Sequence, residues 1–287
     1  MIVYGRNPVR EALRGRRARS VAGVWATASV AHEPWLTGVE TKVCGADELE
    51  RVCGSSAHQG VCAEMGGYPY VGARELLAVE SSLIVALDQV QDPQNLGSIC
   101  RTAECAGVTG VVIPERRAAE VTPAACKASA GAVEHVRIAR VRNIADFLGE
   151  AREAGCWSYG ASALVRAPAD PDGYGARPDS GVAVGARDAG AQAGVTGSAR
   201  AAAPARSARS DRGHEPVPYT APDYSGGVVL VLGSEGSGLR PRVASACDQI
   251  ISLPLRGQME SLGVAAAAAA LLYGILQSRD VALDKAP

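Results

Sequence analysis

The stretch "DPQNLGSICRTAECAGV", residues 92–108, decides the fold class. It follows the apolar run "SLIVALDQV", residues 82–90, so the pattern predicts a buried strand that leads into a helix of small residues. That helix carries Asn95 and Arg101, and a core needs neither an amide nor a guanidinium. From this stretch alone two interpretations stay open. Asn95 is either a ligand-binding residue or a helix cap, and Arg101 either binds an anion or forms a surface ion pair.

Strand and helix patterns alternate on both sides of this stretch. The runs "GVVI" (110–113), "VRIARV" (136–141) and "CWSYGAS" (156–162) read as strands, with helices expected from about residue 123 and over 143–153. A further buried strand lies in "GGVVLVLGSEGSGL", residues 226–239. This alternation predicts an α/β fold with a parallel sheet covered by helices on both faces.

The domain organisation follows from shifts in composition. Residues 1–66 suit a small α/β domain that opens with a helix capped by Asn7, and residues 67–82 read as a linker. Residues 83–165 and 219–280 form the second domain. Residues 166–218 are rich in Ala, Gly, Pro, Ser and Arg without an apolar period, which predicts a disordered insert.

Composition narrows the class of protein. The 287 residues are 47% hydrophobic with a net charge of -1, which indicates a globular protein without a general attraction to nucleic acid. Binding to phosphate would need a local cluster, and one occurs near the N-terminus, where six arginines face only Glu11: Arg6, Arg10, Arg14, Arg16, Arg17 and Arg19. This cluster is either a solvated face or an RNA-contacting one.

Cysteines and apolar runs exclude other classes. The eight cysteines form no C-x-x-C pair, so we expect reduced, mostly buried thiols and no metal site. The apolar run "SLGVAAAAAALLYGIL", residues 261–276, is shorter than the roughly 20 residues of a bilayer span. We expect neither a leader segment nor a membrane segment, and a cytoplasmic location.

Two more loops resemble the first in form, because each lies between a buried strand and a helix. "GSEGSG", residues 233–238, lacks the glycine order of a dinucleotide-binding or P-loop motif. In "LPLRGQMESLGVA", residues 253–265, Ser261 precedes an Ala-rich helix. It can cap that helix, serve a site, or do both. Ligands bind beyond the carboxyl ends of parallel strands, so the three loops are expected to form one site.

Together these segments resemble a known family. Residues 92–108, "LVLGSEGSGL" (230–239) and "ISLPLRGQMESLGVAAAAA" (251–269) resemble, in this order, the three motifs of the SpoU (TrmH) family of RNA ribose 2′-O-methyltransferases in the SPOUT superfamily. "YGRNPVREAL" (4–13) and "HQGVCAEM" (58–65) resemble the L30e-like substrate-binding domain of the branch that methylates a guanosine in 23S ribosomal RNA.

The resemblance implies a specific architecture and activity. It implies a trefoil-knotted, parallel-sheet methyltransferase domain preceded by a small L30e-like α/β domain, with S-adenosylmethionine as cofactor. It also implies a homodimer whose active site draws on both chains, and RNA as the partner. The expected reaction transfers a methyl group to a ribose 2′-hydroxyl of ribosomal RNA, at a guanosine of the large subunit.

The same resemblance assigns roles to individual residues. The implied catalytic positions are Asn95, Arg101, Glu235 and Ser261. The implied cofactor-binding positions are Gly233, Leu253, Gly257 and Leu262. The implied RNA-binding positions are Arg6, Arg10, His58 and Gln59. The resemblance makes Arg101 the candidate base. A phosphate clamp is the alternative, because a guanidinium remains protonated and can hold a phosphate with two hydrogen bonds.

Three other functions stay open from the sequence. The substrate could be transfer RNA, or the protein could protect the ribosome from a peptide antibiotic. Gly263 stands where the family has Asn, which keeps open an RNA-binding or ribosome-assembly protein with weak catalysis. A nucleotide-dependent oxidoreductase is disfavoured because no G-x-G-x-x-G follows a strand.

Overall fold

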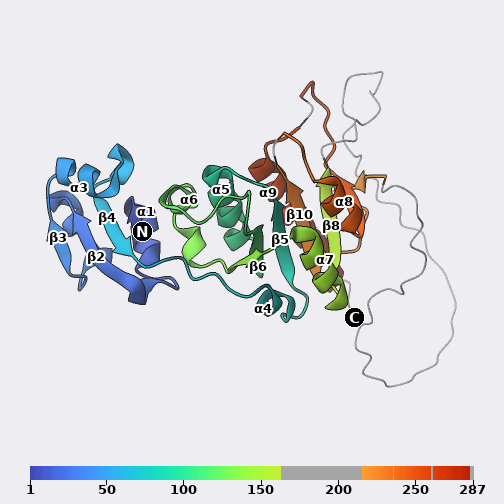
Figure 1. The fold of residues 1–287 in the computed structure, drawn as a ribbon, viewed down its shortest axis with the longest axis horizontal. Helices are drawn as coiled ribbons and strands as arrows, with labels where there is room; N and C mark the ends of the chain where they lie inside the picture. Colours follow the sequence, from blue (N-terminus) through green and yellow to red (C-terminus); the bar gives the residue numbers. More distant parts are fainter. Residues whose placement is uncertain (163–214, 235, 260, 285–287) are drawn as a thin grey trace, which may run out of the picture.

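The computed structural model describes residues 1–162, 215–234, 236–259 and 261–284. It contains two sheets that follow one another along the long axis of the molecule (Figure 1). A four-stranded sheet comes from residues 2–65 and a seven-stranded sheet from residues 83–252. Within the described residues, no helix combines the length and hydropathy needed to span a membrane.

The first sheet has the strand order β1-β4-β2-β3. Its strands are β1 (Ile2–Tyr4), β2 (Val21–Ala26), β3 (Thr41–Val43) and β4 (Val61–Met65), flanked by helices α1 (Arg6–Ala12), α2 (Ala28–Ala31) and α3 (Ala46–Cys53). The predicted cap at Asn7 is wrong. Helix α1 begins at Arg6, two residues earlier than expected, and its N-cap is Gly5, whose φ of 100° is accessible to glycine.

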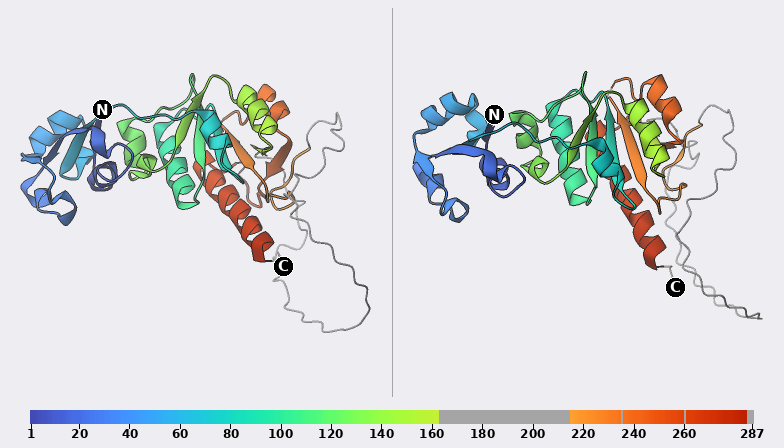
Figure 2. Two further views of the ribbon diagram at one scale, coloured as in Figure 1. Left: turned by 90° about the horizontal axis from the view of Figure 1, so that it is seen from below. Right: turned by 60° about the horizontal axis from the view of Figure 1, so that its bottom comes forward.

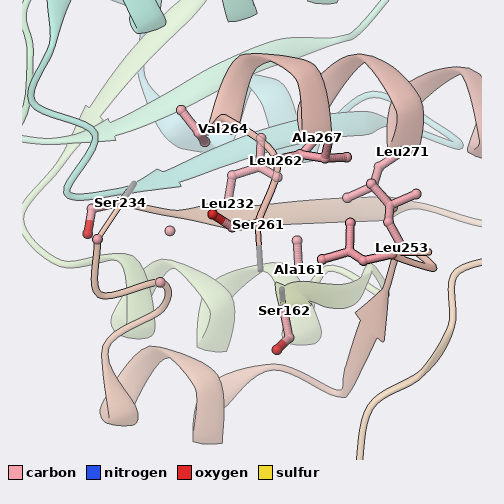
Figure 3. Close-up of a pocket in the computed structure, with 14 residues that line it drawn as sticks. Ala161, Ser162, Leu232, Ser234, Leu253, Ser261, Leu262, Val264, Ala267 and Leu271 are labelled. Carbon is pink, nitrogen blue, oxygen red and sulfur yellow. The ribbon is translucent and has the colours of Figure 1, made fainter. Parts of the chain in front are cut away.

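The second sheet is wholly parallel and has the order β7-β6-β5-β10-β8-β11-β9. Its strands are β5 (Leu83–Asp88), β6 (Gly110–Pro114), β7 (Ile138–Val141), β8 (Trp157–Ser162), β9 (Val217–Pro218), β10 (Val228–Gly233) and β11 (Gln249–Ser252). This confirms the predicted α/β class. All carboxyl ends share one edge, where the pocket of Figure 3 lies.

Strand β9 corrects one boundary of the predicted insert. Val217 and Pro218 were assigned to that insert, yet they pair with Ile251 and Ser252 of β11. Residues 166–214 of the predicted insert lie outside the described residues, as do residues 163–165 before it.

Helices cover both faces of the second sheet. They are α4 (Ala73–Leu77), α5 (Pro93–Cys105), α6 (Pro123–Ala128), α7 (Ile144–Glu153), α8 (Pro241–Ala246) and α9 (Val264–Asp284). Residues of β5 alternate between two buried clusters, with Val85 facing α5 and α9, and Ile84 facing α4, α7 and α8. Figure 2 shows α9 on the side of the sheet opposite α7 and α8.

Small residues let α5 and α6 approach closely. A Cβ added at Gly97 would lie 2.6 Å from the Ala125 carbonyl oxygen and 2.7 Å from the Ala128 Cβ. Glycine at position 97 therefore sets the spacing of these two helices, which explains the small-residue composition of this stretch.

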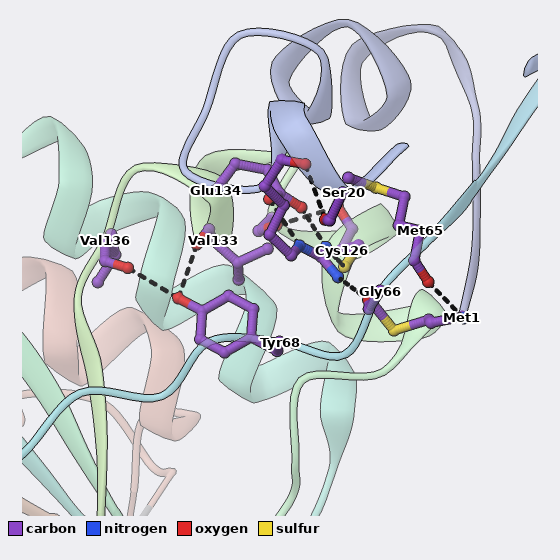
Figure 4. Close-up of polar contacts among 11 residues, drawn as sticks. Met1, Ser20, Met65, Gly66, Tyr68, Cys126, Val133, Glu134 and Val136 are labelled. Atoms are coloured by element: carbon purple, nitrogen blue, oxygen red, sulfur yellow. Dashed lines mark hydrogen bonds and ion pairs between the residues drawn. The ribbon is translucent and has the colours of Figure 1, made fainter. Parts of the chain in front are cut away.

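A buried ion pair joins the two sheets (Figure 4). Arg17, which follows α1, donates from Nε to Glu134 Oε2 at 2.9 Å, and its Nη2 pairs with Glu134 Oε1. Both side chains are almost completely buried, with 1% and 0% exposure. Arg17 also donates to the Gly66 carbonyl at 3.3 Å. Arg17 is therefore a buried structural residue and is not part of an exposed basic cluster near the N-terminus.

Further contacts strengthen this junction. The Lys127 ammonium on α6 donates to the Ala57 carbonyl at 2.9 Å, and His135 Nε2 lies 3.0 Å from Glu11 Oε2. In the predicted linker, the Tyr68 hydroxyl lies 2.9 Å from the Val133 carbonyl oxygen. One buried apolar cluster continues from the first sheet to α5 and α6. The part of the chain that contains the first sheet is thus packed against the part that contains the second, and is not joined to it by a linker alone.

The cysteines behave as buried hydrophobic residues. All eight are free, and five are buried: Cys62, Cys100, Cys126, Cys156 and Cys247. Burial raises the pKa of the Cys100 thiol to about 12 and of the Cys126 thiol to about 11. These thiols are unreactive at neutral pH. The described part of the chain contains no cluster of His, Cys, Asp or Glu that could hold a metal.

Candidate functional site

A pocket of about 340 Å³ opens at the carboxyl ends of β8, β10 and β11 (Figure 3). Its floor is apolar, with Leu232, Leu253 and Leu271 among the lining residues. Polar groups come from the glycine loop after β10 and from Ser261 in the loop before α9. Mainly apolar pockets of this size with a few polar groups are typical of small-ligand sites.

The glycine loop after β10 is tightly closed on itself. Ser234 and Gly238 exchange two backbone hydrogen bonds of 3.2 and 3.0 Å, and Gly238 has a φ of +64°. A Cβ at Gly233 would lie 2.1 Å from the carbonyl carbon of Gly238. Only glycine at 233 permits this turn, so the loop shape that borders the pocket depends on it.

A buried carboxylate anchors the end of the same loop. Asp88 is the last residue of β5 and is completely buried. It accepts hydrogen bonds from the backbone N–H of Arg240 at 2.9 Å and from Arg240 Nε at 2.8 Å, and it forms an ion pair with the same guanidinium. Asp88 thereby fixes the exit of the glycine loop to the neighbouring strand.

The loop after β11 forms the other wall. Leu253, Leu255, Ser261 and Leu262 line the pocket from this loop. Helix α9 begins at Val264, and the hydrogen bond from Ala267 N to the Gly263 carbonyl opens it. Ser261 therefore lies three residues before the helix and is not its cap, which removes the capping alternative.

Asn95 and Arg101 lie on α5, outside the residues that line the pocket. The cap of α5 is Asp92, whose side chain accepts from the Gln94 N–H at 2.8 Å, so Asn95 is not the cap. Arg101 is exposed and makes no ion pair with any residue that the structure describes. The structural alternatives for both residues are therefore wrong.

The structure brings together four of the predicted site residues, Gly233, Leu253, Ser261 and Leu262, around one pocket. Gly257 is exposed in the same loop but does not line the pocket. Glu235 lies outside the described residues.

The predicted RNA-binding residues lie beside the first sheet, with Arg6 and Arg10 on α1 and His58 and Gln59 in the turn before β4. The Arg6 N–H donates to Gln59 Oε1 at 3.1 Å, and the Arg6 guanidinium pairs with Glu33 at 3.1 Å. Arg10 pairs with the neighbouring Glu11. His58 is only 8% exposed, and its Nδ1 accepts from the Gly60 N–H at 2.9 Å. His58 thus holds the turn, while Arg6 and Gln59 face solvent.

Sequence reasoning missed part of the site. Ala161 and Ser162 line the pocket from the end of β8, and Asp88 anchors the glycine loop. The sequence contained a pattern that could have indicated both, because ligand sites in parallel sheets form at the carboxyl ends of the strands. Ala161 and Ser162 end the predicted strand "CWSYGAS", and Asp88 ends the apolar run "LIVALD".

Fold and pocket together define an α/β protein that binds a small ligand beyond the carboxyl ends of its parallel strands. The chain belongs to the SpoU rRNA methylase family, whose model matches residues 82–193 and 196–273. A second model, for RNA 2′-O ribose methyltransferase substrate binding, matches residues 2–71. The chain is therefore an RNA methyltransferase, and SpoU methyltransferases use S-adenosylmethionine.

Relatives and solved structures agree with this assignment. The chain is 30% identical to the 23S rRNA (guanosine-2′-O-)-methyltransferase RlmB of Acinetobacter baylyi, over 84% of this chain and 80% of that protein. It is 31% identical to an uncharacterised tRNA/rRNA methyltransferase of Mycolicibacterium vanbaalenii, over 97% and 76%. The fold matches the SpoU methyltransferase AviRb of Streptomyces viridochromogenes, solved with AdoMet, at a TM-score of 0.66 and 21% identity, over 98% and 90%.

Replacing Asp88 with asparagine tests the anchor of the glycine loop. We expect the free energy of unfolding to fall by about 2 kcal/mol, because the charged acceptor of three Arg240 contacts is lost. Affinity for S-adenosylmethionine should fall about tenfold, measured by calorimetry.

The matched control is Asp146→Asn, which breaks an exposed pair with Arg242 and should cost less than about 0.5 kcal/mol. Equal effects of the two variants would show that Asp88 does not anchor the loop.

Proposed function

We propose that this protein transfers a methyl group from S-adenosylmethionine to a ribose 2′-hydroxyl of ribosomal RNA, at a guanosine of the large subunit. One observation carries the proposal: the loops after β10 and β11, which hold the second and third family motifs, meet around a single pocket. The 30% identity to the guanosine 2′-O-methyltransferase RlmB supports the choice of substrate.

The pocket fits the proposed cofactor. Leu253 and Leu262 offer apolar surface to a planar base, and the exposed backbone beside Gly233 and Gly236 lets polar ligand groups approach closely. When bound, S-adenosylmethionine supplies a methyl group on a positively charged sulfur. The pocket contains no described lysine or arginine, which suits a cationic ligand.

The proposed mechanism depends mainly on positioning. Arg101 holds a substrate phosphate through its two-pronged guanidinium and so aligns the ribose hydroxyl for in-line attack. Asn95 and Ser261 orient the same ribose by hydrogen bonding, and Glu235 shapes the loop or orients Arg101. The alternative role of Arg101, accepting the hydroxyl proton, is disfavoured because an arginine side chain is always charged and has no free acceptor for a proton.

Arg101 lies outside this chain's own pocket, which supports the proposal of a homodimer whose sites draw on both chains. Apolar side chains are exposed near the pocket and along α9, with Met259 at 80%, Leu262 at 48% and Tyr273 at 52%. Contiguous exposed apolar groups mark interaction surfaces. The family likeness further supports a trefoil knot. Light scattering at twice the chain mass of 29.4 kDa would support the dimer.

We further propose a division of labour along the chain. Residues 1–66 contact RNA through Arg6, Arg10 and Gln59, with residues 67–82 as the connection. Residues 83–165 and 219–280 carry the methyl transfer. The exposure of Arg6 and Gln59 on one face supports this assignment.

Arg101→Lys tests the role of the guanidinium. We expect kcat/KM for RNA to fall about 100-fold, because an ammonium keeps the charge but cannot hold a phosphate with two parallel hydrogen bonds. Affinity for S-adenosylmethionine should stay unchanged. Arg51→Lys, on α3, is the control. Near-full activity of the Arg101 variant would exclude both the clamp and an arginine-specific base.

The decisive experiment measures methyl transfer from labelled S-adenosylmethionine to total RNA, followed by alkaline digestion. A methylated 2′-oxygen cannot attack the neighbouring phosphodiester, so a labelled alkali-resistant dinucleotide would establish ribose methylation. The size class of the labelled RNA would separate ribosomal from transfer RNA.

Gly263 supports a second candidate, a weakly catalytic RNA-binding or ribosome-assembly protein. It stands where the family has Asn, and a Cβ at this position would meet nothing within 4 Å. Absence of label, with assembly intermediates also supplied as substrate, would favour this candidate. Gly263→Asn should then restore transfer, because the space for the amide exists.

A further inference from the structure

Three arginines gather beyond the carboxyl ends of β6 and β7. Arg116 and Arg117 follow β6 after one intervening residue, Glu115, and Arg142 follows β7 directly. All three are exposed, and none makes a hydrogen bond or ion pair with any residue in the described ranges. We call Arg116, Arg117 and Arg142 the arginine edge. A hollow between the two loops is lined by Arg116, Arg142 and Glu115.

The loop that carries Arg116 and Arg117 is held in place on several sides. The Glu115 N–H donates to the Val141 carbonyl at 2.8 Å, and the Ala119 N–H donates to the Val90 carbonyl at 2.8 Å. Further along, the Val121 N–H donates to the Tyr70 hydroxyl at 3.0 Å. The arginine edge is thus presented from a fixed backbone, which lowers the entropic cost of binding.

A fourth arginine acts as the support of this loop. Arg140, on β7, donates to the Glu115 carbonyl at 3.1 Å and pairs with Glu120 at 3.0 Å. Its guanidinium also lies 5.2 Å from the centre of the Tyr70 ring. Arg140 therefore neutralises Glu120, and Glu115 is the one acidic residue lining the hollow beside two unpaired arginines.

The parallel sheet places the arginine edge on the same side as the pocket. Strands β10, β5, β6 and β7 are consecutive neighbours and run in the same direction. With about 4.8 Å between strands, the ends of β6 and β7 lie roughly 10 and 14 Å from the end of β10. These distances are shorter than the length of the several nucleotides that a groove for single-stranded nucleic acid covers. Asn95 lies on α5, which follows β5, and β5 lies between β10 at the pocket and β6 at the arginine edge.

We infer that the arginine edge binds backbone phosphates of the substrate RNA beside the methylated nucleotide. This inference rests on the proposed function and adds a contact surface on the second sheet to the one proposed on the first. Arginine suits the role because its guanidinium can hold a phosphate with two parallel hydrogen bonds. Phosphate contacts fix the position of the strand and do not read its sequence.

Neutral variants test the inference. Arg116→Gln, Arg142→Gln and the double variant are compared with wild type in binding to purified large-subunit ribosomal RNA at several salt concentrations. The plot of log K against log salt should flatten by about one unit for each single variant and by about two for the double variant. Affinity of the double variant at roughly 0.1 M salt should fall about tenfold.

The matched control is Arg74→Gln on α4. This variant also removes one positive charge, but at the opposite edge of the sheet, near the amino ends of the strands. Helix α4 precedes β5, and its Leu76 lies against Gly110, the first residue of β6. For this variant, the slope of log K against log salt should equal that of wild type. Calorimetry with S-adenosylmethionine shows whether each variant keeps a folded pocket, and all should bind with wild-type affinity.

Two results would overturn the inference and are distinguishable. If wild type binds and methylates RNA while the arginine-edge variants keep its slope and affinity, the inference is wrong and the proposed function stands. If wild type itself binds no RNA and transfers no methyl group, the proposed function fails and the inference fails with it. A slope change equal to that of Arg74→Gln would also count against a specific phosphate contact.

Discussion

Replacing Gly233 with alanine is expected to weaken S-adenosylmethionine binding by about 100-fold, which corresponds to roughly 3 kcal/mol. The added Cβ would lie 2.1 Å from the Gly238 carbonyl carbon and 2.4 Å from the Leu239 nitrogen. These are backbone atoms of the same loop, so no side-chain rotation can relieve the clash. The loop must open, and the wall of the pocket moves with it.

Calorimetric titration would measure the loss, with far-ultraviolet circular dichroism as a check of folding. The matched control is Gly226→Ala, just before the same strand, where an added Cβ meets nothing within 4 Å. That variant should bind as wild type does. Wild-type affinity in Gly233→Ala would mean that the cofactor is not held by the glycine loop, and the assignment of the pocket would be wrong.

Replacing Glu134 with glutamine is expected to lower the free energy of unfolding by about 3 kcal/mol. Arg17 is 1% exposed and pairs with the Glu134 carboxylate. It would keep its charge in the variant, because a guanidinium is not deprotonated in proteins. Burial is the largest single influence on the pKa of Arg17 and lowers it, but the hydrogen bond and the charge of Glu134, together with smaller contributions from Cys126, raise the pKa above its usual value. The variant therefore leaves a buried cation without its partner.

Denaturant titration followed at two wavelengths would measure this loss and would show whether the two sheets separate before either unfolds. Glu150→Gln is the control, since it breaks an exposed pair with Arg74 and should cost less than about 0.5 kcal/mol. The double variant Arg17→Met with Glu134→Leu should recover most of the stability. A Glu134→Gln variant as stable as the control would show that this pair does not hold the sheets together.

The local patterns predicted individual elements well. The run "LIVALD" became β5, and Asn143 caps α7 with its side chain 2.9 Å from the Ala145 N–H. Both outcomes depend on residues close in sequence, through hydrophobic periodicity and capping. Two of the three loops, those after β10 and β11, line one pocket as expected, whereas no residue of the first loop, 92–108, lines it.

Contacts between distant segments could not be predicted in the same way. Arg17 stood in a run of arginines and gave no sign of its partner, which lies 117 residues further along the chain. Arg240 and Asp88 are separated by 152 residues. Likewise, the insertion of β10 between β5 and β8 depends on tertiary pairing and leaves no local pattern. The knot and the dimer entered only through the family resemblance and stay predictions.

The packed junction between the two sheets has a consequence for target choice. With Arg17 and Glu134 buried and Lys127 bonded to Ala57, the first sheet cannot swing freely about the second. The distance from Gln59 to the pocket is then a fixed length of the molecule. Under the proposed function, this fixed length would determine which ribose reaches the pocket when residues 1–66 bind a particular feature of the folded RNA.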